Sequence, residues 1–213
     1  MAFWRRKRAP EPSVGTAFLG VIPCAGSSTR MGRSKALLDA GGRSFLAATV
    51  GALTAGGCHP VAVVLAEGQE DEARKAQAAG ALCLTNPDPG EGPITSLRLA
   101  LAALGDSTEV VAYLPVDHPR VRPETVAALR QALLASDAPL ALPLYQGKRG
   151  HPALFRRSLF PALLDADLEG GARTVVHAHL DRAIQLEVDD PGVVTDIDTP
   201  EAYRQAFLPE SQP

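Results

Sequence analysis

Short aliphatic segments alternate with segments of helical periodicity along most of this chain, and this alternation constrains the fold more than any other feature. Five apolar runs are typical of buried strands, at residues 17–22, 60–66, 81–84, 110–115 and 139–144. Four segments between them predict helices, at residues 44–55, 69–79, 94–104 and 123–133. Such alternation predicts a mostly parallel three-layer α/β sheet, with ligands at the carboxyl ends of the strands.

The last third of the chain is less regular. Its expected elements are a loop entering an edge strand at 149–155, short helices at 159–164 and 172–179, and strands at 183–188 and 193–198. Thr199-Pro200 is expected to cap and open a closing helix that ends near Phe207. Because no repeat or linker marks a second domain, residues 16–208 are predicted to form one domain.

Composition supports this fold class and excludes others. Of the 213 residues, 46% are hydrophobic and 21% charged, unlike disordered, collagenous or coiled-coil chains. Aromatic residues make up 5%, and the 19 glycines and 18 prolines require frequent turns, so the core is expected to be mostly aliphatic. No apolar run approaches the roughly 20 residues of a membrane span, and the N-terminus lacks an apolar signal core. We therefore expect a cytoplasmic protein that binds neither membranes nor nucleic acid.

Residues 1–15 are predicted to form a separate basic tail. Four cations at positions 5–8 against Glu11 give this tail a charge of +3, so the formal net charge of −3 leaves −6 for the rest of the chain. Such a run can contact nucleic acid or a membrane surface, but the prolines that follow favour a solvated, disordered tail. We assign it no function.

The three cysteines, Cys24, Cys58 and Cys83, lie far apart and form no C-x-x-C pair. Neither a disulfide framework nor a zinc site is supported, and two of the three are expected to pack in the core. For Cys24 a packing role is favoured over a reactive thiol.

The densest chemical signal directly follows the first predicted strand, where residues 24–35 read Cys-Ala-Gly-Ser-Ser-Thr-Arg-Met-Gly-Arg-Ser-Lys. A turn of small residues lets backbone amides approach an anion closely, and Arg30 and Lys35 can neutralise phosphate charge. The composition therefore predicts a triphosphate-binding loop. The segment 24–35 is neither a Walker A sequence nor a G-x-G-x-x-G fingerprint. The alternative is a structural turn with surface cations.

Acidic residues follow two further segments. Asp117 comes at the carboxyl end of the fourth predicted strand, where open α/β sheets bind ligands, and carboxylate oxygens are preferred ligands of Mg²⁺. Asp196 and Asp198 are expected on one face of a strand, from which both can reach the same ion. The alternatives are a turn aspartate at 117, and helix capping by Asp198 or Thr199.

In this order, the segments resemble the MobA-like nucleotidyltransferases over residues 17–207, most closely the molybdenum cofactor cytidylyltransferase branch. The motifs that carry the resemblance are the turn from Pro23 to Lys35, Asn86-Pro87 with G-x-x-x-S-L at 92–97, Leu114-Pro115-Val116-Asp117-His118-Pro119, Gly150-His151-Pro152, Gly171-Ala172-Arg173 and D-I-D-T-P at 196–200. Each motif alone is weak evidence, whereas the ordered set is specific.

The resemblance implies a three-layer, Rossmann-like nucleotidyltransferase fold and a Mg²⁺-dependent transfer of a nucleoside monophosphate, with release of pyrophosphate. The implied donor is CTP and the implied acceptor is molybdopterin. The implied catalytic residues are Arg30, Lys35 and Asp117, and the implied metal ligands are Asp117, Asp198 and Asp196. The implied nucleotide-binding residues are Cys24, Ala25, Gly26, Ser27, Ser28, Arg30, Met31, Gly32, Lys35, Asn86, Gly92 and Ser96. His151 and Arg173 are implied to face the acceptor.

Some positions depart from the family pattern. Pro23 replaces a non-proline residue and removes a backbone N–H that could contact the base. The Ala-Gly pair at 25–26 favours cytidylyl transfer, whereas the Gly-Pro pair at 92–93 is more similar to the guanylyl branch. His118 falls at a variable position and is expected to be an exposed turn histidine.

Two alternative functions stay open. The acceptor can be another phosphorylated molecule, such as a sugar or polyol phosphate, because related folds use similar loops. The protein can also be a non-catalytic carrier that delivers nucleotide or molybdopterin to a partner, such as a molybdoenzyme or its chaperone. Lys35, Asp117 and Asp198 together argue against a carrier, which needs no metal centre.

Overall fold

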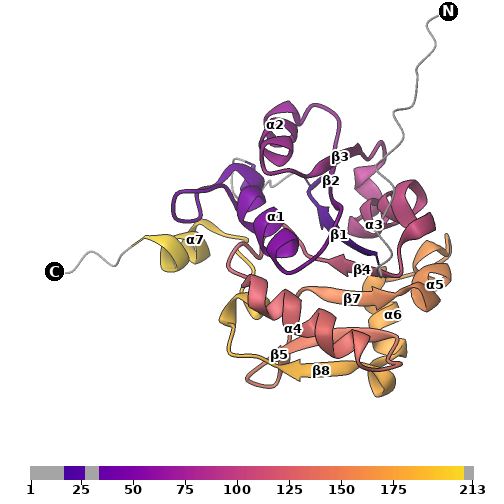
Figure 1. Ribbon diagram of the computed structural model, residues 1–213. Helices are drawn as coiled ribbons and strands as arrows, with labels where there is room; N and C mark the ends of the chain where they lie inside the picture. Colours follow the sequence, from indigo (N-terminus) through magenta and orange to yellow (C-terminus); the bar gives the residue numbers. More distant parts are fainter. Residues whose placement is uncertain (1–16, 27–33, 209–213) are drawn as a thin grey trace, which may run out of the picture.

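The structure, a computed structural model, describes residues 17–26 and 34–208 (Figure 1). The strands are β1 (Phe18–Pro23), β2 (Val61–Leu65), β3 (Leu82–Thr85), β4 (Val110–Tyr113), β5 (Leu140–Tyr145), β6 (Lys148–Arg149), β7 (Ala153–Arg156) and β8 (Ile184–Glu187). The α-helices are α1 (Phe45–Ala55), α2 (Glu70–Ala78), α3 (Pro93–Leu104), α4 (Pro123–Leu134), α5 (Phe160–Leu164), α6 (Ala172–Ala178) and α7 (Pro200–Phe207). Up to residue 145, the predicted strands and helices are confirmed to within two residues.

One sheet contains all the strands of the described residues, in the order β3-β2-β1-β4-β7-β5-β6, with β8 paired to β5. β1 is parallel to both β2 and β4, and β8 is parallel to β5, whereas β7 runs antiparallel to β4 and β5. The predicted mostly parallel sheet is therefore confirmed. Since β1 and β4 are parallel neighbours, the loops that follow them leave the same edge of the sheet.

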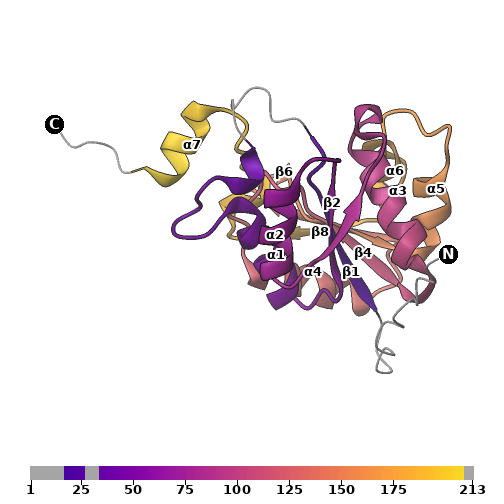
Figure 2. The same cartoon turned by 90° about the horizontal axis from the view of Figure 1, so that it is seen from above.

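Alternation of side chains along β1 explains why helices cover both faces of the sheet. Phe18 and Ile22 belong to one core cluster, which includes residues of α1 and α4, whereas Leu19 and Val21 belong to a second cluster with residues of α3. Figure 2 shows the three layers, with α1, α2 and α4 on one face and α3, α5 and α6 on the other. Strands covered on both faces are expected to be continuously apolar, as β1 is.

Two helices begin directly after residues whose side chains cap them. Ser44 Oγ accepts a hydrogen bond of 3.1 Å from the Ala47 N–H at the start of α1. Thr199 Oγ1 accepts one of 3.2 Å from the Ala202 N–H at the start of α7. Because Thr199 caps α7, the carboxylate of Asp198 is available for other contacts.

Helix α7 extends from the body of the molecule and is attached through aromatic side chains (Figure 1). The ring of Phe45 in α1 lies 6.0 Å from that of Tyr203 and 5.5 Å from that of Phe207, measured between centroids. This contact joins the C-terminal helix to the core cluster around α1.

The segment 149–155 contains the predicted loop and strand, but the predicted edge position of the strand is wrong. β7 lies between β4 and β5 in the interior of the sheet. Ala153, Leu154 and Phe155 are all buried. An apolar run of three residues covered on both faces suits an interior strand, although the preceding Gly150 and Pro152 resemble loop residues.

The predicted strand at 193–198 is also absent. Residues 191–194 form a 3₁₀ turn, which Asp190 caps by accepting a 3.0 Å hydrogen bond from the Gly192 N–H. Residues 195–198 pair with no strand in the described part of the chain. The N–H of Ile197 instead donates to the carbonyl of Asp117 at 2.9 Å, so it contributes to a contact between loops.

Cys24 and Cys58 are buried, as expected for core thiols. Within the described residues, no helix is long and apolar enough to cross a membrane. The basic tail at residues 1–15 lies outside the described residues, and the single domain at 16–208 stays a prediction.

Candidate functional site

A cavity of about 760 Å³ opens at the carboxyl ends of β1 and β4. Residues 23–26 line it from the end of β1, and Asp117 and His118 line it from the loop after β4. Gly92 and Ser96 line it from the start of α3. Segments far apart in sequence therefore meet where the topology predicts a ligand site.

A lysine between two carboxylates is the main charged feature of this cavity. Lys35 Nζ lies 2.5 Å from Asp198 Oδ1 and 3.4 Å from Asp117 Oδ2. All three side chains are partly buried. Sequence reasoning predicted each of these residues as a site residue, and the structure brings them together.

The backbone explains why the two carboxylates meet. Asp117 follows β4 directly, and its carbonyl accepts the hydrogen bond from Ile197. The side chain of Ile197 is completely buried. Since Ile197 anchors the loop, its neighbours Asp196 and Asp198 both line the cavity. Asp198 reaches Lys35, whereas Asp196 is exposed.

Burial and mutual attraction shift the protonation equilibria of this cluster. Burial raises the pKa of Asp117 above its usual range, although the nearby His118 and Lys35 favour the charged form. Burial tends to lower the pKa of Lys35, but the hydrogen bond to Asp198 and the charge of Asp117 raise it overall. Lys35 is therefore held as an ammonium group.

The carboxylates fit a divalent cation. Asp117 Oδ2 and Asp198 Oδ1 both lie within 3.4 Å of one point, the Lys35 Nζ atom. Mg²⁺ binds one or two protein carboxylates and takes water and phosphate oxygens as its other ligands. The open cavity leaves room for such ligands. Across the described part of the chain, no group of three or more acidic, histidine or cysteine side chains forms a metal cluster, so Asp196 does not complete a set with the other two aspartates.

The beginning of the predicted phosphate loop is part of the cavity wall. Cys24, Ala25 and Gly26 line it, and the Cys24 N–H donates to the Val64 carbonyl at 2.8 Å. Burial raises the pKa of the Cys24 thiol to about 12, which keeps it protonated and inert. The other predicted residues of this loop, Ser27, Ser28, Arg30, Met31 and Gly32, lie outside the described residues.

Asn86 differs from the other predicted nucleotide-binding residues that the structure describes, because it is absent from the cavity lining. Its side-chain amide donates to Thr95 Oγ1 at 2.8 Å and to Ser96 Oγ at 3.3 Å, and its Oδ1 accepts from the Asp88 N–H at 3.0 Å. Asn86 thus positions the start of α3, where Gly92 and Ser96 contact the cavity.

His118 is buried, so the prediction of an exposed turn histidine is wrong. The residue is 7% exposed. The centroid of its ring lies 4.9 Å from that of the His151 ring, in an edge-to-face arrangement. Its Nδ1 lies 3.2 Å from the Gly192 carbonyl oxygen. Both histidines line the cavity. The contacts come from segments distant in sequence, which is why the local pattern around His118 did not reveal them.

A second cavity, of about 780 Å³, adjoins the first. The two share part of their walls, namely Pro93, Tyr113, Pro115, Arg149 and His151. Apolar side chains of Ile94, Leu142, Phe155, Leu168 and Val176 line the second cavity. Arg173 and His177, on α6, also line it, with Arg173 Nε 3.4 Å from His177 Nε2. The two predicted acceptor residues, His151 and Arg173, therefore border the same cavity.

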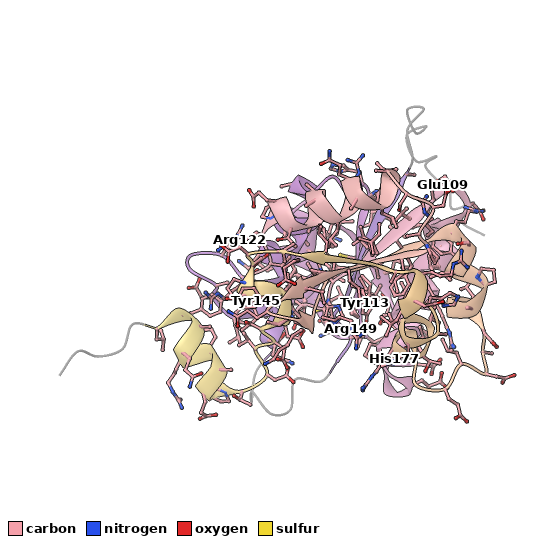
Figure 3. All side chains as sticks on the ribbon, turned by 90° about the horizontal axis from the view of Figure 1, so that it is seen from below. Glu109, Tyr113, Arg122, Tyr145, Arg149 and His177 are labelled. Carbon is pink, nitrogen blue, oxygen red and sulfur yellow. The ribbon has the colours of Figure 1, made fainter. Side chains whose placement is uncertain are left out.

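Sequence reasoning missed two cations of the β5–β6 hairpin. Lys148 lines the first cavity, and Arg149 lines both. Figure 3 shows Arg149 on the same side of the molecule as Tyr113 and His177. The available signal was the pair of cations directly before Gly150-His151-Pro152.

A mostly parallel α/β sheet with a large cavity and a charged cluster at its strand ends defines a ligand-binding protein of the Rossmann-like class. Residues 20–183 match the family described as MobA-like NTP transferase domain. The chain belongs to this family.

Several relatives are similar over most of their length. A molybdenum cofactor guanylyltransferase of Rhizobium meliloti is 30% identical over 212 residues, which cover 92% of this chain and 93% of the relative. The nicotine blue oxidoreductase of Paenarthrobacter nicotinovorans is 28% identical, covering 85% and 92%. The molybdenum cofactor cytidylyltransferase of Escherichia coli is 26% identical, covering 86% and 92%.

Solved structures confirm the fold class. Rv0371c of Mycobacterium tuberculosis, in complex with manganese, superposes with a TM-score of 0.75 at 28% identity and covers 92% of this chain and 100% of its own. A nucleotidyl transferase from Methanothermobacter shares the fold with a TM-score of 0.73 at 21% identity, covering 90% and 96%. The three-layer Rossmann-like nucleotidyltransferase fold predicted from the sequence is thus confirmed.

Proposed function

We propose that the protein is a Mg²⁺-dependent nucleotidyltransferase that transfers CMP from CTP to molybdopterin and releases pyrophosphate. The observation that carries this proposal is the cluster of Lys35, Asp117 and Asp198 inside a cavity large enough for a nucleotide. A protein that only carried molybdopterin would have no use for this arrangement.

In this proposal, the acceptor phosphate oxygen attacks the α-phosphorus of the NTP. A phosphorus–oxygen bond forms to the acceptor, the bond between the α-phosphorus and the bridging oxygen breaks, and pyrophosphate leaves with the electron pair. Because the acceptor is already an anionic nucleophile, no covalent enzyme intermediate is needed, and the protein contributes alignment and charge neutralisation. Lys35 neutralises charge on the phosphates through its ammonium group.

Asp117 and Asp198 are proposed to hold Mg²⁺. Asp196, which lines the same cavity but is exposed, is proposed as a weaker ligand. When bound, the cation stabilises negative charge on the phosphate oxygens. Support for a divalent cation comes from the two carboxylates that converge on Lys35 and from the manganese complex of Rv0371c. Arg30 and the loop residues Ser27, Ser28, Met31 and Gly32 are proposed to surround the triphosphate together with residues 24–26.

The acceptor is proposed to occupy the second cavity. Its apolar walls suit a flat heterocycle, and Arg173 with His151 supplies polar contacts at its edges. The proposal that the acceptor is molybdopterin rests on this cavity and on the two relatives whose names specify molybdenum cofactor. A sugar or polyol phosphate has no flat apolar surface that could pack against the apolar walls of the second cavity.

The choice of base is a separate question, for which the sequence offers two opposed signals. The Ala-Gly pair at 25–26 favours CTP, whereas the Gly-Pro pair at 92–93 and the guanylyltransferase relative favour GTP. Both pairs line the first cavity, so their position does not decide the base. We propose CTP on the resemblance of the Ala-Gly pair to the cytidylyltransferase branch. GTP is the second candidate.

The test is a measurement of pyrophosphate release by the purified protein with Mg²⁺ and molybdopterin, using CTP, GTP, ATP and UTP in turn. We expect release that depends on molybdopterin, with the highest kcat/KM for CTP. A higher kcat/KM for GTP would overturn the choice of base only. Absence of release with every NTP would overturn nucleotidyl transfer.

A further inference from the structure

Arg149 lies at the boundary between the two cavities. It is one of the residues that line both, whereas its neighbour Lys148 lines the first cavity only. In an in-line transfer, the phosphate of the bound acceptor has to reach from the acceptor pocket to the α-phosphorus in the nucleotide pocket. A cation at this boundary is therefore placed where that phosphate must lie.

The backbone of Arg149 is held firmly on both sides. Within the β5–β6 hairpin, Arg149 pairs with Leu144, and the next N–H, of Gly150, donates to the Pro143 carbonyl at 3.0 Å. The His151 N–H donates to the Val193 carbonyl at 2.8 Å.

Gly150 shows how closely the hairpin is packed against the 3₁₀ turn. A Cβ atom at this position would lie 2.1 Å from the Val193 carbonyl oxygen, a separation that no side chain tolerates. The absence of a side chain at 150 lets the two backbones touch. Arg149 is therefore attached to a rigid part of the cavity wall, which is an advantage for a binding residue.

The lack of a partner for the Arg149 side chain among the described residues also indicates an anionic ligand there. The described walls of the first cavity carry the carboxylates of Asp117, Asp196 and Asp198. Two of these engage the ammonium group of Lys35. Arg149 is exposed and forms no hydrogen bond or ion pair with any described residue through its side chain. Its guanidinium donors are thus available to a ligand.

We infer that Arg149 binds the phosphate group of the acceptor and selects acceptors that carry one. The inference rests on the proposed nucleotidyl transfer and adds a residue to it. A guanidinium group donates two parallel hydrogen bonds to a phosphate, which fixes orientation as well as charge. A lysine at the same place supplies the charge without the paired geometry.

The experiment compares R149A and R149K with the unchanged protein in pyrophosphate release at saturating NTP and varied molybdopterin. For R149A, we expect the KM for molybdopterin to rise about 10-fold to 100-fold, as for loss of a hydrogen bond to a charged group, while the KM for NTP changes less than about twofold. R149K should give an intermediate KM. R182A is the matched control, because Arg182 is exposed and lines neither cavity, and it should behave like the unchanged protein.

Binding of a phosphorylated pterin and of the same pterin without its phosphate gives a second readout. The unchanged protein should prefer the phosphorylated compound, and R149A should lose this preference while its thermal unfolding stays unchanged. An undiminished preference in R149A, or a rise in the KM for NTP alone, would overturn the inference and leave the proposed transfer intact. If the unchanged protein releases no pyrophosphate with any NTP, the proposed function fails, and the role of Arg149 fails with it.

Discussion

Lys35 Nζ and Asp198 Oδ1 lie 2.5 Å apart, although 163 residues separate them in the sequence. The contact joins the loop after β1 to the loop before α7, and it places a cation between Asp198 and Asp117. The ammonium group partly offsets the repulsion between the two carboxylates, although burial and the charge of Asp198 still raise the pKa of Asp117. The same two carboxylates are the proposed ligands of Mg²⁺.

The first prediction concerns these carboxylates. Asp117→Asn and Asp198→Asn should each lower kcat for pyrophosphate release by about 100-fold or more, because a lost metal ligand removes several kcal/mol of stabilisation from the transition state. Asp196→Asn should have a milder effect, since Asp196 is exposed and does not contact Lys35. Steady-state kinetics with Mg²⁺ varied will measure both effects.

Asp137→Asn serves as the control for these variants, because Asp137 is exposed and lies outside both cavities. Circular dichroism establishes that each variant folds. Near-normal turnover in folded Asp117→Asn would rule out the proposed metal ligands, and a larger loss in Asp196→Asn than in Asp198→Asn would mean that the wrong carboxylate was chosen.

A second prediction addresses Lys35. Lys35→Ala should lower kcat at least as strongly as it raises the KM for NTP, because a cation beside developing phosphate charge acts mainly in the transition state. The order of preference among NTPs should stay the same, since Lys35 is proposed to act on the charge of the phosphates and not on the base. Arg30→Ala should behave similarly. An increase in KM alone, or a changed base preference, would contradict this role.

The fold up to β5 could be predicted because its strands and helices have clear periodicity and local caps, such as Ser44. In the last third, α5, α6, β8 and α7 were predicted to within one residue. The interior position of β7 and the loop at 195–198 were not, because they depend on distant partners. The N–H of Ile197 is satisfied by Asp117 instead of a neighbouring strand. His118 is buried because His151 and Gly192 cover it, and neither is near it in sequence.

The same distinction between local pattern and long-range contact holds for the site. Asp117, Asp198 and Lys35 could be predicted from motifs, whereas their convergence on one point could not, since it depends on the parallel pairing of β1 and β4 and on the loop at 195–198. Asn86 forms local hydrogen bonds that hold the start of α3, and its binding of nucleotide stays a prediction. Arg149 was missed because a basic hairpin is common on protein surfaces.

The third prediction is that Asp190 stabilises the wall behind His118. Its buried carboxylate accepts hydrogen bonds from Thr125 Oγ1 at 2.7 Å, from the Arg122 N–H at 2.9 Å and from the Gly192 N–H at 3.0 Å. Asp190→Ala leaves these donors without an acceptor and should lower the free energy of unfolding by roughly 2–4 kcal/mol. Urea denaturation measures this change.

Asp189→Ala is the matched control for Asp190→Ala. Asp189 is the exposed neighbour, and its backbone carbonyl, which accepts from Arg122 Nη1, is retained in the variant. The control should change stability by less than about 0.5 kcal/mol. Equal effects of the two variants would show that the hydrogen bonds of Asp190 contribute no net stability.

The fourth prediction concerns pH. Burial, with a smaller effect of His118, lowers the pKa of His151 to about 4 from the usual 6.5. Above pH 6.5 the histidine is neutral in both the folded and unfolded chains, so its titration does not lower the free energy of unfolding there. As the pH falls from 6.5 towards 4, only the unfolded chain gains the proton, and stability decreases by at most roughly 3 kcal/mol.

Urea unfolding between pH 7 and pH 4.5 checks this expectation. His151→Gln, which cannot titrate, should lose less stability over this range than the unchanged protein. His59→Gln is the control, because His59 is exposed and should leave the pH dependence as it was. Identical slopes for His151→Gln and the unchanged protein would refute the lowered pKa.

The last prediction tests the location of the acceptor pocket. Arg173 lines the second cavity and is absent from the lining of the first, so Arg173→Ala should raise the KM for molybdopterin with little effect on the affinity for CTP measured alone. His151 borders both cavities, so His151→Ala should weaken acceptor use and also reduce stability, since it leaves a space beside the buried His118 ring. Calorimetry with CTP and kinetics with acceptor varied at saturating CTP separate the two effects. Unchanged kcat and KM for the acceptor in both variants would mean that the second cavity does not bind it.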